Sequence, residues 1–496
     1  MASILSRLFG RSEQSTPPAP AKTPRIRTGR GARAEYDAAT VGKRAAGWRR
    51  TLLDANAELS PAVMQALRGI ARDLERNNPF AARGVSTIAN NMVGTGITFQ
   101  VHRNGKVDDR LNKIAREHFD KPNCDAAGRH DLYGLQLQAA RTLVVGGEVL
   151  MRRRWRRASD RLPMPFQLQV LEPDYIDSSK HGLAASGGGY FVHGIQFSQI
   201  GRRTGYWLFA GHPGDARPRQ TGSSFVPAAD IAHVFRADRP EQERGATWLA
   251  PIVLRMKDFA DYEDAQLTRQ KIATSFVGFV SNEEGDGIPG VEQDEQDERL
   301  DYVEPGTFQY GRPGDKIDWS NPPGVDGYAD YSRVSLRAIS AGLGVPYEAL
   351  TGDLSNVNFS SGRMGWLEYQ RSLAAWQWTM FIPQFCGAVG QWMIEALEVM
   401  GEDVSGVEVR WTPPGREMIN PSEEVKATRD AIRAGLDTIS AAARRRGEDP
   451  DVFLAEWAAD AARIDALKLT FDSDPRKVTA VGNPADQGAA NSTQGA

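Results

Sequence analysis

Cysteine is almost absent from this chain of 496 residues: only Cys124 and Cys386 occur, far apart in the sequence. A disulfide scaffold and a cysteine-based zinc site are therefore excluded, and a reducing cytosol is the expected compartment. A surplus of one charge is also lacking, because 60 basic residues stand against 63 acidic ones and the formal net charge is −3. This balance excludes a histone-like polycation and an acidic disordered chaperone. With 41% hydrophobic residues the chain can bury sizeable cores, and its length suggests roughly two to four domains or one elaborated architecture.

The sequence motifs of catalysis are lacking as well. Neither Gly42-Lys43 nor Gly105-Lys106 has the upstream glycine of a phosphate-binding P-loop, and no G-x-S-x-G or H-E-x-x-H motif occurs. The seven histidines are never closer than twelve residues, which removes short-spaced pairs of metal ligands. We therefore expect a protein that is not an enzyme and has no cofactor and no metal site, although residues distant in sequence can still meet in the fold.

The longest uncharged stretch lies between Arg371 and Glu395 and exceeds the length of a membrane-spanning helix. A helix carries a seven-residue repeat of glutamines as one slowly drifting polar stripe, and the repeat here consists of Gln370, Gln377, Gln384 and Gln391. The remaining side chains are mostly apolar, and Pro383 is expected to kink the helix and to shift the stripe. The pattern predicts a long, kinked, mostly buried helix at about 361–400 rather than a membrane span.

Helix-start signals divide the rest of the chain. Ser60-Pro61 and Asn78-Pro79 each combine an N-cap residue with proline at the first helical position. Strand patterns take over after Gly146-Gly147 and continue to about residue 240. Asn420-Pro421-Ser-Glu423 resembles a capping box and opens a small helical module, which Asp449-Pro450 continues to about residue 470. Further helices are predicted at about 109–119, 132–145, 247–274 and 327–341, and a short strand at 97–101.

Three charged or polar segments are candidates for binding. The segment from Glu283 to Glu304 has ten acidic residues against the single Arg299, which fits either a solvated loop or a docking surface for a basic partner. The polar loop at 352–361 offers neutral Asn and Ser groups that would not hold a phosphate tightly. An arginine cluster lies on or just after a predicted strand, and it fits a phosphate contact, a solvated strand end or an inter-subunit ion-pair surface. Its members are Arg152, Arg153, Arg154, Arg156 and Arg157.

Several stretches of the sequence resemble, in order, the portal proteins of tailed bacteriophages, specifically the lambda-type portal family. The most specific stretch runs from residue 342 to 352 and continues at 358–363. The others lie at residues 72–81, 90–97, 171–177 and 244–251, and the similarity extends from about 36 to 460. It is the common order and spacing of these stretches that carry the resemblance.

The resemblance implies an α+β portal fold that closes into a ring, typically a dodecamer. The Pro/Ala/Arg-rich start predicts a disordered basic arm at 1–35, either a solvated tail or an arm that binds DNA or a partner, and the Gly/Ala/Asn/Gln-rich end predicts a disordered tail at 471–496. Between them the resemblance implies, in chain order, an α/β wing at 36–244, a stem helix at 245–274, a clip at 275–318 and a second stem helix at 319–345. A channel loop at 346–362, a long kinked wing helix with a return strand at 363–419 and a helical crown at 420–470 follow. The long uncharged helix is expected to supply area buried between subunits, where its glutamines satisfy one another or backbone groups across the interface.

For function, the resemblance implies a channel at one capsid vertex through which DNA is packaged and ejected. The implied partners are the large terminase subunit, a head–tail connector or adaptor protein, the major capsid and scaffold proteins, and double-stranded DNA without sequence preference; no membrane is involved. The implied location is the portal vertex of the virion, after assembly in the host bacterial cytoplasm. The alternatives are a terminase-like DNA-processing subunit of the packaging machinery and another structural head-completion protein.

Two sets of residues follow from the same resemblance. The channel loop would touch DNA weakly through neutral groups, with Arg363 as either a phosphate contact or an inter-subunit salt bridge; the set is Asn356, Asn358, Phe359, Ser360, Ser361 and Arg363. The clip would dock the terminase and the connector through its acidic run. That set is Glu292, Asp294, Glu295, Asp297 and Glu298.

Overall fold

The computed structural model describes residues 51–184, 188–216, 222–274, 278–281, 316–319, 327–355 and 357–469, together with positions 47, 471, 474 and 476. All elements described below belong to one unit that begins at Asp54. The predicted basic arm at 1–35, the clip carboxylates at 292–298, Asn356 and most of the predicted tail at 471–496 lie outside the described residues.

Three helices open this unit: α1 (Ala55–Glu58), α2 (Pro61–Asn77) and α3 (Pro79–Val93). The two predicted N-caps are confirmed. The Ser60 side chain accepts a hydrogen bond from the amide at the third helical position of α2, and Asn78 Oδ1 accepts from the amides of Phe80 and Ala81 at 3.1 and 3.0 Å. Much of α3 is buried because it packs against α5 (Leu132–Gly146), which fixes both helices in the main core.

The strands of the described residues pair in antiparallel fashion throughout. β1 (Thr98–Arg103) lies between β2 (Lys106–Val107) and β13 (Val407–Thr412), and its start falls close to the predicted one. β3 (Glu148–Trp155) lies between β4 (Phe166–Leu171) and β10 (Ile231–Phe235). A five-stranded sheet follows the order β5 (Gly182–Leu183), β6 (Tyr190–Val192), β7 (Ile195–Phe197), β8 (Arg203–Phe209) and β9 (Ser223–Pro227). The mixed α+β class predicted from the sequence is confirmed.

Short helical elements connect these strands and helices. α4 (Asp109–Phe119) follows the β1–β2 hairpin, within the predicted bounds, and the Asp108 side chain caps it by accepting from the Leu111 amide at 3.0 Å. Single 3₁₀ turns occur at η4 (Pro122–Cys124), η5 (Ala158–Asp160), η6 (Pro173–Tyr175) and η7 (Ala228–Asp230).

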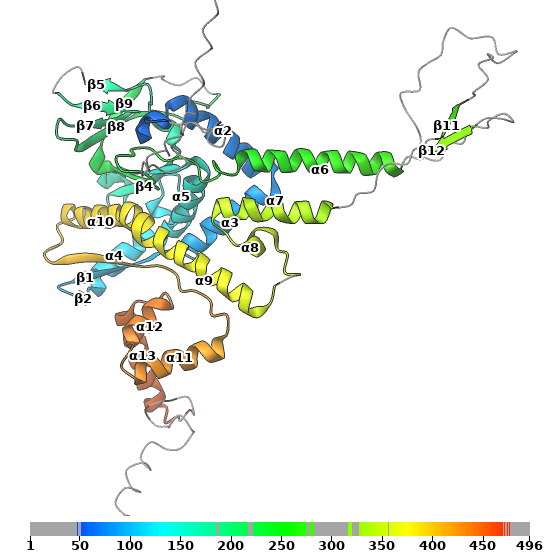
Figure 1. The fold of residues 1–496 in the computed structure, drawn as a ribbon. Coiled ribbons are helices and arrows are strands. Elements are labelled where there is room, and N and C mark those ends of the chain that lie inside the picture. The colour runs from blue at the N-terminus through cyan, green and yellow to red at the C-terminus, as the bar shows by residue number, and fades with distance from the viewer. Residues whose placement is uncertain are drawn as a thin grey trace, which may run out of the picture. The chain divides into compact units, whose positions relative to one another are not determined.

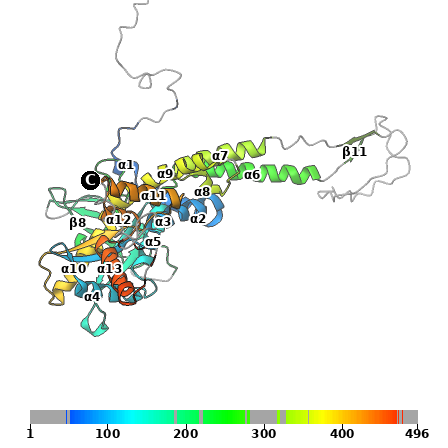
Figure 2. The same cartoon turned by 90° about the horizontal axis from the view of Figure 1, so that it is seen from below.

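Two helices, α6 (Val253–Thr274) and α7 (Tyr328–Leu343), lie side by side (Figures 1 and 2). Tyr262 of α6 packs on Tyr331 of α7 with 4.2 Å between the ring centroids, and the Tyr328 hydroxyl donates to Glu263 at 3.1 Å. α6 begins later than the predicted residue 247, because the chain at 248–252 forms turns in which Trp248 is buried. Within the predicted clip, β11 (Gly278–Ser281) pairs with β12 (Lys316–Trp319).

The predicted long helix is present in three parts: α9 (Phe359–Trp376), a π-helical stretch η8 (Gln377–Cys386) and α10 (Gly387–Val399). Figure 1 shows that α9 and α10 run in different directions, so the helix bends. Pro383 lies inside the π-helical stretch. Proline cannot donate the backbone hydrogen bond that a regular helix needs, and an irregular turn at its position accounts for the bend.

The expectation that the glutamines of this helix serve an interface between subunits is wrong for two of them, because their partners lie in the same chain. Gln377 Nε2 donates to the Met92 carbonyl at 2.7 Å, and Gln384 Oε1 accepts from the Phe235 amide at 2.9 Å. The apolar side of the helix is likewise buried within the chain, from Leu373 to Leu397. Among the described helices, none is long and apolar enough to cross a membrane.

Three helices follow β13: α11 (Pro421–Arg433), α12 (Ile439–Arg445) and α13 (Pro450–Ala466). They confirm the predicted helical module at 420–470. Asn420 caps α11, but the reciprocal acceptor of the capping box is Glu424 rather than the expected Glu423. Glu424 Oε1 accepts from the amides of Ile419 and Asn420 at 3.2 and 3.3 Å.

Candidate functional site

The predicted channel loop starts from α8 (Tyr347–Thr351), a short helix between α7 and α9. Leu350 of α8 and Leu343 of α7 are both buried. A Cβ atom at Gly84 of α3 would lie 2.7 Å from Leu343 Cδ1 and 3.4 Å from Leu350 Cδ1, so glycine allows the helices to approach closely. The Arg83 guanidinium also donates to the Ala349 carbonyl at 3.1 Å. The loop is therefore anchored to the main core at its first end.

A hydrogen-bonded turn begins the loop itself. Gly352, with φ +74°, ends α8 and redirects the chain. The Asp353 carboxylate accepts from the Ser355 hydroxyl at 2.6 Å, from the Ser355 amide at 3.0 Å and from the Tyr347 hydroxyl at 3.0 Å. These bonds, with those from Ser355 first, lower the pKa of Asp353. The loop thus carries an ionised carboxylate whose oxygen atoms already have donors.

Two of the predicted DNA-contacting residues form the N-cap of α9. Asn358 Oδ1 accepts from the Ser361 amide at 2.8 Å, and Ser361 Oγ accepts from the Asn358 amide at 3.2 Å. This reciprocal pair satisfies two amides that a helix start otherwise leaves without partners. Both residues are exposed, so the cap fixes the direction in which α9 leaves the loop while keeping the loop surface polar.

Of the other predicted loop residues, Phe359 and Ser360 lie between the two cap residues and Arg363 follows them. Ser360 is exposed on the first turn of α9, and Arg363 lies one turn further along. Arg363 lines a cavity of about 490 Å³ together with Leu354, Trp366 and the segment at 417–419. The structure therefore places Arg363 in the lining of a groove to which the loop itself contributes Leu354, and Phe359 is the first residue of α9.

The predicted arginine cluster on β3 does not form one surface. Arg153 is 7% exposed, and its guanidinium pairs with Asp230 at 2.9 Å and with Glu395 of α10. It also lies over the rings of Trp155 and Trp392, at 4.6 and 5.5 Å from their centroids. Burial alone would raise the pKa of Glu395, but Arg153 lowers it overall. Arg153 therefore joins β3 to the long helix inside the chain.

The other four arginines lie elsewhere, because successive side chains of a strand point to opposite faces and β3 ends at Trp155, before Arg156 and Arg157. Arg152 is half-buried, and burial together with the charge of Arg154 lowers its pKa. Arg156 donates through Nε to Gln167 at 2.7 Å, and Arg157 is exposed. Their phosphate or inter-subunit contacts stay a prediction.

A buried charged cluster, which sequence reasoning missed, lies where β3 begins. The Glu148 and Arg244 side chains have no exposed surface, and Arg244 Nη2 lies 2.6 Å from Glu148 Oε1. The same carboxylate accepts from His233 Nε2 at 2.9 Å and from the Gly245 amide at 3.0 Å. Arg68 of α2 adds a longer contact of 3.5 Å. Helix, sheet and the segment before α6 are thereby joined at one carboxylate.

The protonation states of this cluster follow from its surroundings. Burial alone would raise the pKa of Glu148, but the charge of Arg244 and the hydrogen bond from His233 outweigh it and hold the pKa well below its usual range. Burial lowers the pKa of His233 to about 4, although Glu148 opposes this. His233 is therefore neutral at pH 7 and donates its Nε2 proton to the carboxylate.

Two glycines allow the chain segments of this cluster to meet. Gly147 has φ +84°, and a Cβ atom there would lie 2.2 Å from the Ala246 carbonyl carbon. A Cβ atom at Gly245 would lie 2.1 Å from the Gly147 carbonyl oxygen. Both charged residues therefore stand next to a glycine in the sequence, in Gly146-Gly147-Glu148 and in Arg244-Gly245. Their pairing could not be predicted, because 96 residues separate Glu148 from Arg244.

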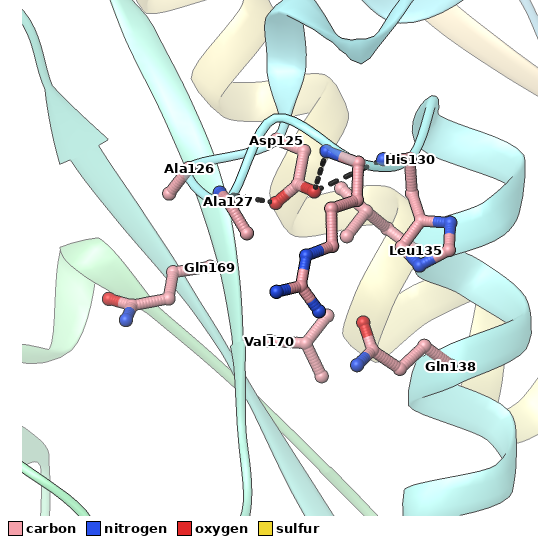
Figure 3. A pocket seen from close by; sticks show the side chains of 9 residues that line it. Asp125, Ala126, Ala127, His130, Leu135, Gln138, Gln169 and Val170 are labelled. Carbon is pink, nitrogen blue, oxygen red and sulfur yellow. Dashed lines mark hydrogen bonds between the residues drawn. The ribbon is translucent and has the colours of Figure 1, made fainter.

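A smaller cavity of about 210 Å³ lies beside the loop at 125–130 (Figure 3). The Asp125 carboxylate accepts from the amides of Ala127 and Arg129 at 2.8 Å and of His130 at 3.1 Å. It therefore serves to fold the loop. Arg129, His130, Gln138 and Gln169 also line the cavity.

Comparison with known proteins gives one family for most of the chain. The family model described as "Phage portal protein, lambda family" matches residues 41–377. The chain is 26% identical over 433 residues to a probable portal protein of Halomonas phage phiHAP-1, covering 82% of each protein. It is 24% identical over 467 residues to portal protein B of Escherichia phage lambda, covering 81% of this chain and 85% of that one. A chain from the neck of a native gene transfer agent particle is similar with a TM-score of 0.47 and 16% identity, covering 82% of this chain and 98% of that one.

Proposed function

This chain belongs to the lambda family of phage portal proteins, and from that premise we propose that it closes into a ring whose axial channel passes double-stranded DNA into and out of a capsid. The observation that carries the proposal is the arrangement of the described elements α6, α7, α8 and α9. It lies within the matched residues 41–377 and contains a pair of packed helices, an anchored turn and a capped helix start.

The chemistry of the loop supports a conduit. A channel must pass any sequence, so reading of base edges is useless, and strong phosphate binding would stall movement. Between Gly352 and Arg363 the only charged side chains are Asp353 and Arg363, one of each sign. The exposed Asn358, Ser360 and Ser361 offer neutral hydrogen-bonding groups. A sliding polyanion would meet weak, interchangeable contacts there.

Exposed apolar side chains on the same helices supply a surface for side-to-side contact. Leu254 of α6 is 75% exposed, Val334 of α7 59% and Met364 of α9 73%. Contiguous apolar patches on a protein surface mark interaction sites. In a ring they would be covered by the next subunit through a heterologous contact that closes on rotation, with twelve subunits as the number that the family resemblance implies.

The remaining roles are proposed from the family resemblance. The clip would dock the large terminase subunit and later the connector, the outer body would contact the major capsid and scaffold proteins, and the ring would occupy the portal vertex of the virion after assembly in the host cytoplasm. In this role the protein channels DNA and catalyses no reaction.

Negative-stain imaging of the purified full chain tests the ring. We expect rings with a central hole for the wild type, and monomers for Leu254→Asp, because a charge would be placed in the contact surface. Leu183→Asp is the matched control, since Leu183 on β5 is 89% exposed and far along the chain from the two paired helices. It should form rings normally.

Two results would contradict the proposal. A wild-type protein that stays monomeric when concentrated would exclude the ring, and normal rings from Leu254→Asp would exclude the α6 contact. Hydrolysis of ATP or nicking of DNA by the pure protein would favour the terminase-like alternative.

A further inference from the structure

His102, in the middle of β1, is a buried side chain whose polar atoms lack partners. Its exposure is 0%, and neither Nδ1 nor Nε2 has a hydrogen-bond partner among the described residues. A buried polar group left without a hydrogen bond destabilises the folded protein. An imidazole placed in this way therefore indicates a missing partner.

Two carboxylates of the helical module face this imidazole. Asp449 Oδ2 lies 3.8 Å from His102 Nε2, and Asp451 Oδ2 lies 3.9 Å from His102 Nδ1. Asp449 is the N-cap of α13, and its Oδ1 accepts from the amides of Asp451 and Val452 at 3.0 and 3.3 Å. Its second oxygen is thus left directed at the ring.

The separations are too long for hydrogen bonds, and they run from different ring nitrogens, so an ion would bind one nitrogen and the carboxylate beside the other nitrogen would have to turn toward it. One ring nitrogen and one oxygen from each carboxylate lie within 4.8 Å of one another. Ligand atoms bound to Zn²⁺ at about 2.0–2.2 Å lie roughly 3–3.6 Å apart, so side-chain shifts of about 1 Å would complete the shell. Asp451 is 53% exposed on its side chain, which leaves the outer coordination positions open to water.

We propose that His102, Asp449 and Asp451 bind a divalent transition-metal ion, for which Zn²⁺ is the reference probe. A neutral imidazole with two carboxylates carries a charge of −2 that such an ion balances, and this mixed N/O donor set suits zinc better than magnesium or calcium. The bound ion would link the start of α13 to β1. It would thereby hold the helical module against the sheet of β13, β1 and β2.

A second group of potential metal ligands differs from this one, because an arginine already balances the charge of its carboxylates. Glu172, Asp174 and His212 also lie close together, but Arg72 already supplies the cation. Its Nη2 atom lies 3.0 Å from Glu172 and 2.5 Å from Asp174. The described contacts include no ion pair between an arginine or lysine and the Asp449 or Asp451 carboxylate. For this reason the His102 cluster is the better candidate for a metal site.

The test is Zn²⁺ binding to the untagged, metal-free full chain, measured by competition with a chromophoric chelator. We expect one ion per chain and at least a tenfold loss of affinity in Asp451→Asn. This residue is half exposed, so its amide variant should fold even if a variant of the buried His102 does not. Glu456→Gln is the matched control, an exposed carboxylate further along the same helix, and it should bind like the wild type.

At one fixed Zn²⁺ concentration, binding should also raise the unfolding temperature of the wild type and of Glu456→Gln more than that of Asp451→Asn. No saturable binding at one ion per chain, or equal affinities for Asp451→Asn and Glu456→Gln, would overturn the proposal. Protonation of His102 between the carboxylates without any metal uptake would overturn it as well. None of these measurements depends on ring assembly or DNA passage, so the metal site and the proposed function fail or hold separately.

Discussion

Glu148 and Arg244 meet at 2.6 Å across 96 residues of sequence, and neither side chain has any exposed surface. The charge of Arg244 is the largest of the effects that lower the pKa of Glu148 against its burial. Such a pair gives little net stability compared with apolar residues, but it is costly to break, because the remaining partner is then a buried charge.

Replacing Arg244 by Met should therefore lower the free energy of unfolding by about 3–5 kcal/mol, as measured by urea unfolding. Arg371→Met is the control, since Arg371 and Glu368 form an ion pair of which both side chains are more than 70% exposed, and its removal should cost less than about 1 kcal/mol. Equal losses in the two variants would show that the buried cluster is not needed to hold the segments together.

Gly147→Ala tests the close approach that brings Glu148 to Arg244. The left-handed φ of +84° and a Cβ atom 2.2 Å from the Ala246 carbonyl carbon both oppose a side chain. Gly105→Ala is the matched control, because Gly105 has φ +79° with no heavy atom within 4 Å of the added Cβ. The control should lose only the backbone cost of about 1–2 kcal/mol, and Gly147→Ala a further 1–3 kcal/mol, roughly, from overpacking. Thermal unfolding of both proteins measures the difference, and a similar loss in each would contradict the assigned contact.

Acid should destabilise the protein between about pH 6.5 and 4. His118 has no exposed surface and lies 4.9 and 5.4 Å from the ring centroids of Phe119 and Phe166. Burial lowers its pKa from 6.5 to about 4, so the folded protein stays neutral there over a range in which the unfolded chain takes up a proton. Falling pH therefore favours unfolding, by up to about 1.4 kcal/mol per pH unit for each such histidine. The contribution of the neutral His118 to the free energy of unfolding is fully present above pH 6.5 and is lost by about pH 4.

His118→Phe should make the free energy of unfolding less dependent on pH in this window, as measured by urea unfolding at a series of pH values. His233 behaves in the same way, with a pKa of about 4, so a part of the dependence should remain. The exposed His130 is the control site, and His130→Phe should leave the slope unchanged. An unchanged slope in His118→Phe would mean that His118 is charged in the folded protein.

Deletion of residues 353–360 tests the proposed channel loop. The anchors on either side, Leu350 in α8 and Tyr369 in α9, are 2% and 3% exposed and remain in place, so folding and ring formation should be spared. Packaging of DNA, or its retention in filled heads, should be impaired. Ring images of the deletion protein are the control for assembly, and genome-filled heads at wild-type yield would remove the assignment of this loop to the channel.

Charge reversal tests the proposed docking role of the clip. Replacing the carboxylates at 292–298 by lysine should leave ring assembly intact and should weaken binding of the terminase or the connector. The wild-type interaction should also weaken with added salt, because exposed charges are screened. Normal packaging and normal tail joining by the reversed protein would refute acidic docking.

The sequence allowed the helices to be predicted where the signal is local. Ser60, Asn78 and Asp449 each stand before a proline, and a cap bond needs only residues two or three positions away. The bend at Pro383 was predictable for the same reason. The π-helical form of that bend was not, since it depends on how the stretch packs between α3 and β10.

The charged residues show where sequence patterns stop being sufficient. Arg152 and Arg153 are neighbours of the same type, but strand alternation turns Arg153 inward, where it pairs with Asp230 and Glu395, and leaves Arg152 half-buried. The His102 cluster and the Glu148–Arg244 pair join residues that only the tertiary fold brings together. In the loop, Asn358 and Ser361 were predicted for their polarity, and the structure adds that they cap α9.

The hydrogen bonds of Gln377 and Gln384 to backbone groups of their own chain have a consequence for how a ring would form. The long helix makes these hydrogen bonds within one subunit, so it can fold in the monomer. Ring assembly would then join folded monomers and would not be coupled to folding. A ring of this kind should come apart on dilution with its helical circular dichroism unchanged, and a subunit that leaves it should be able to join another.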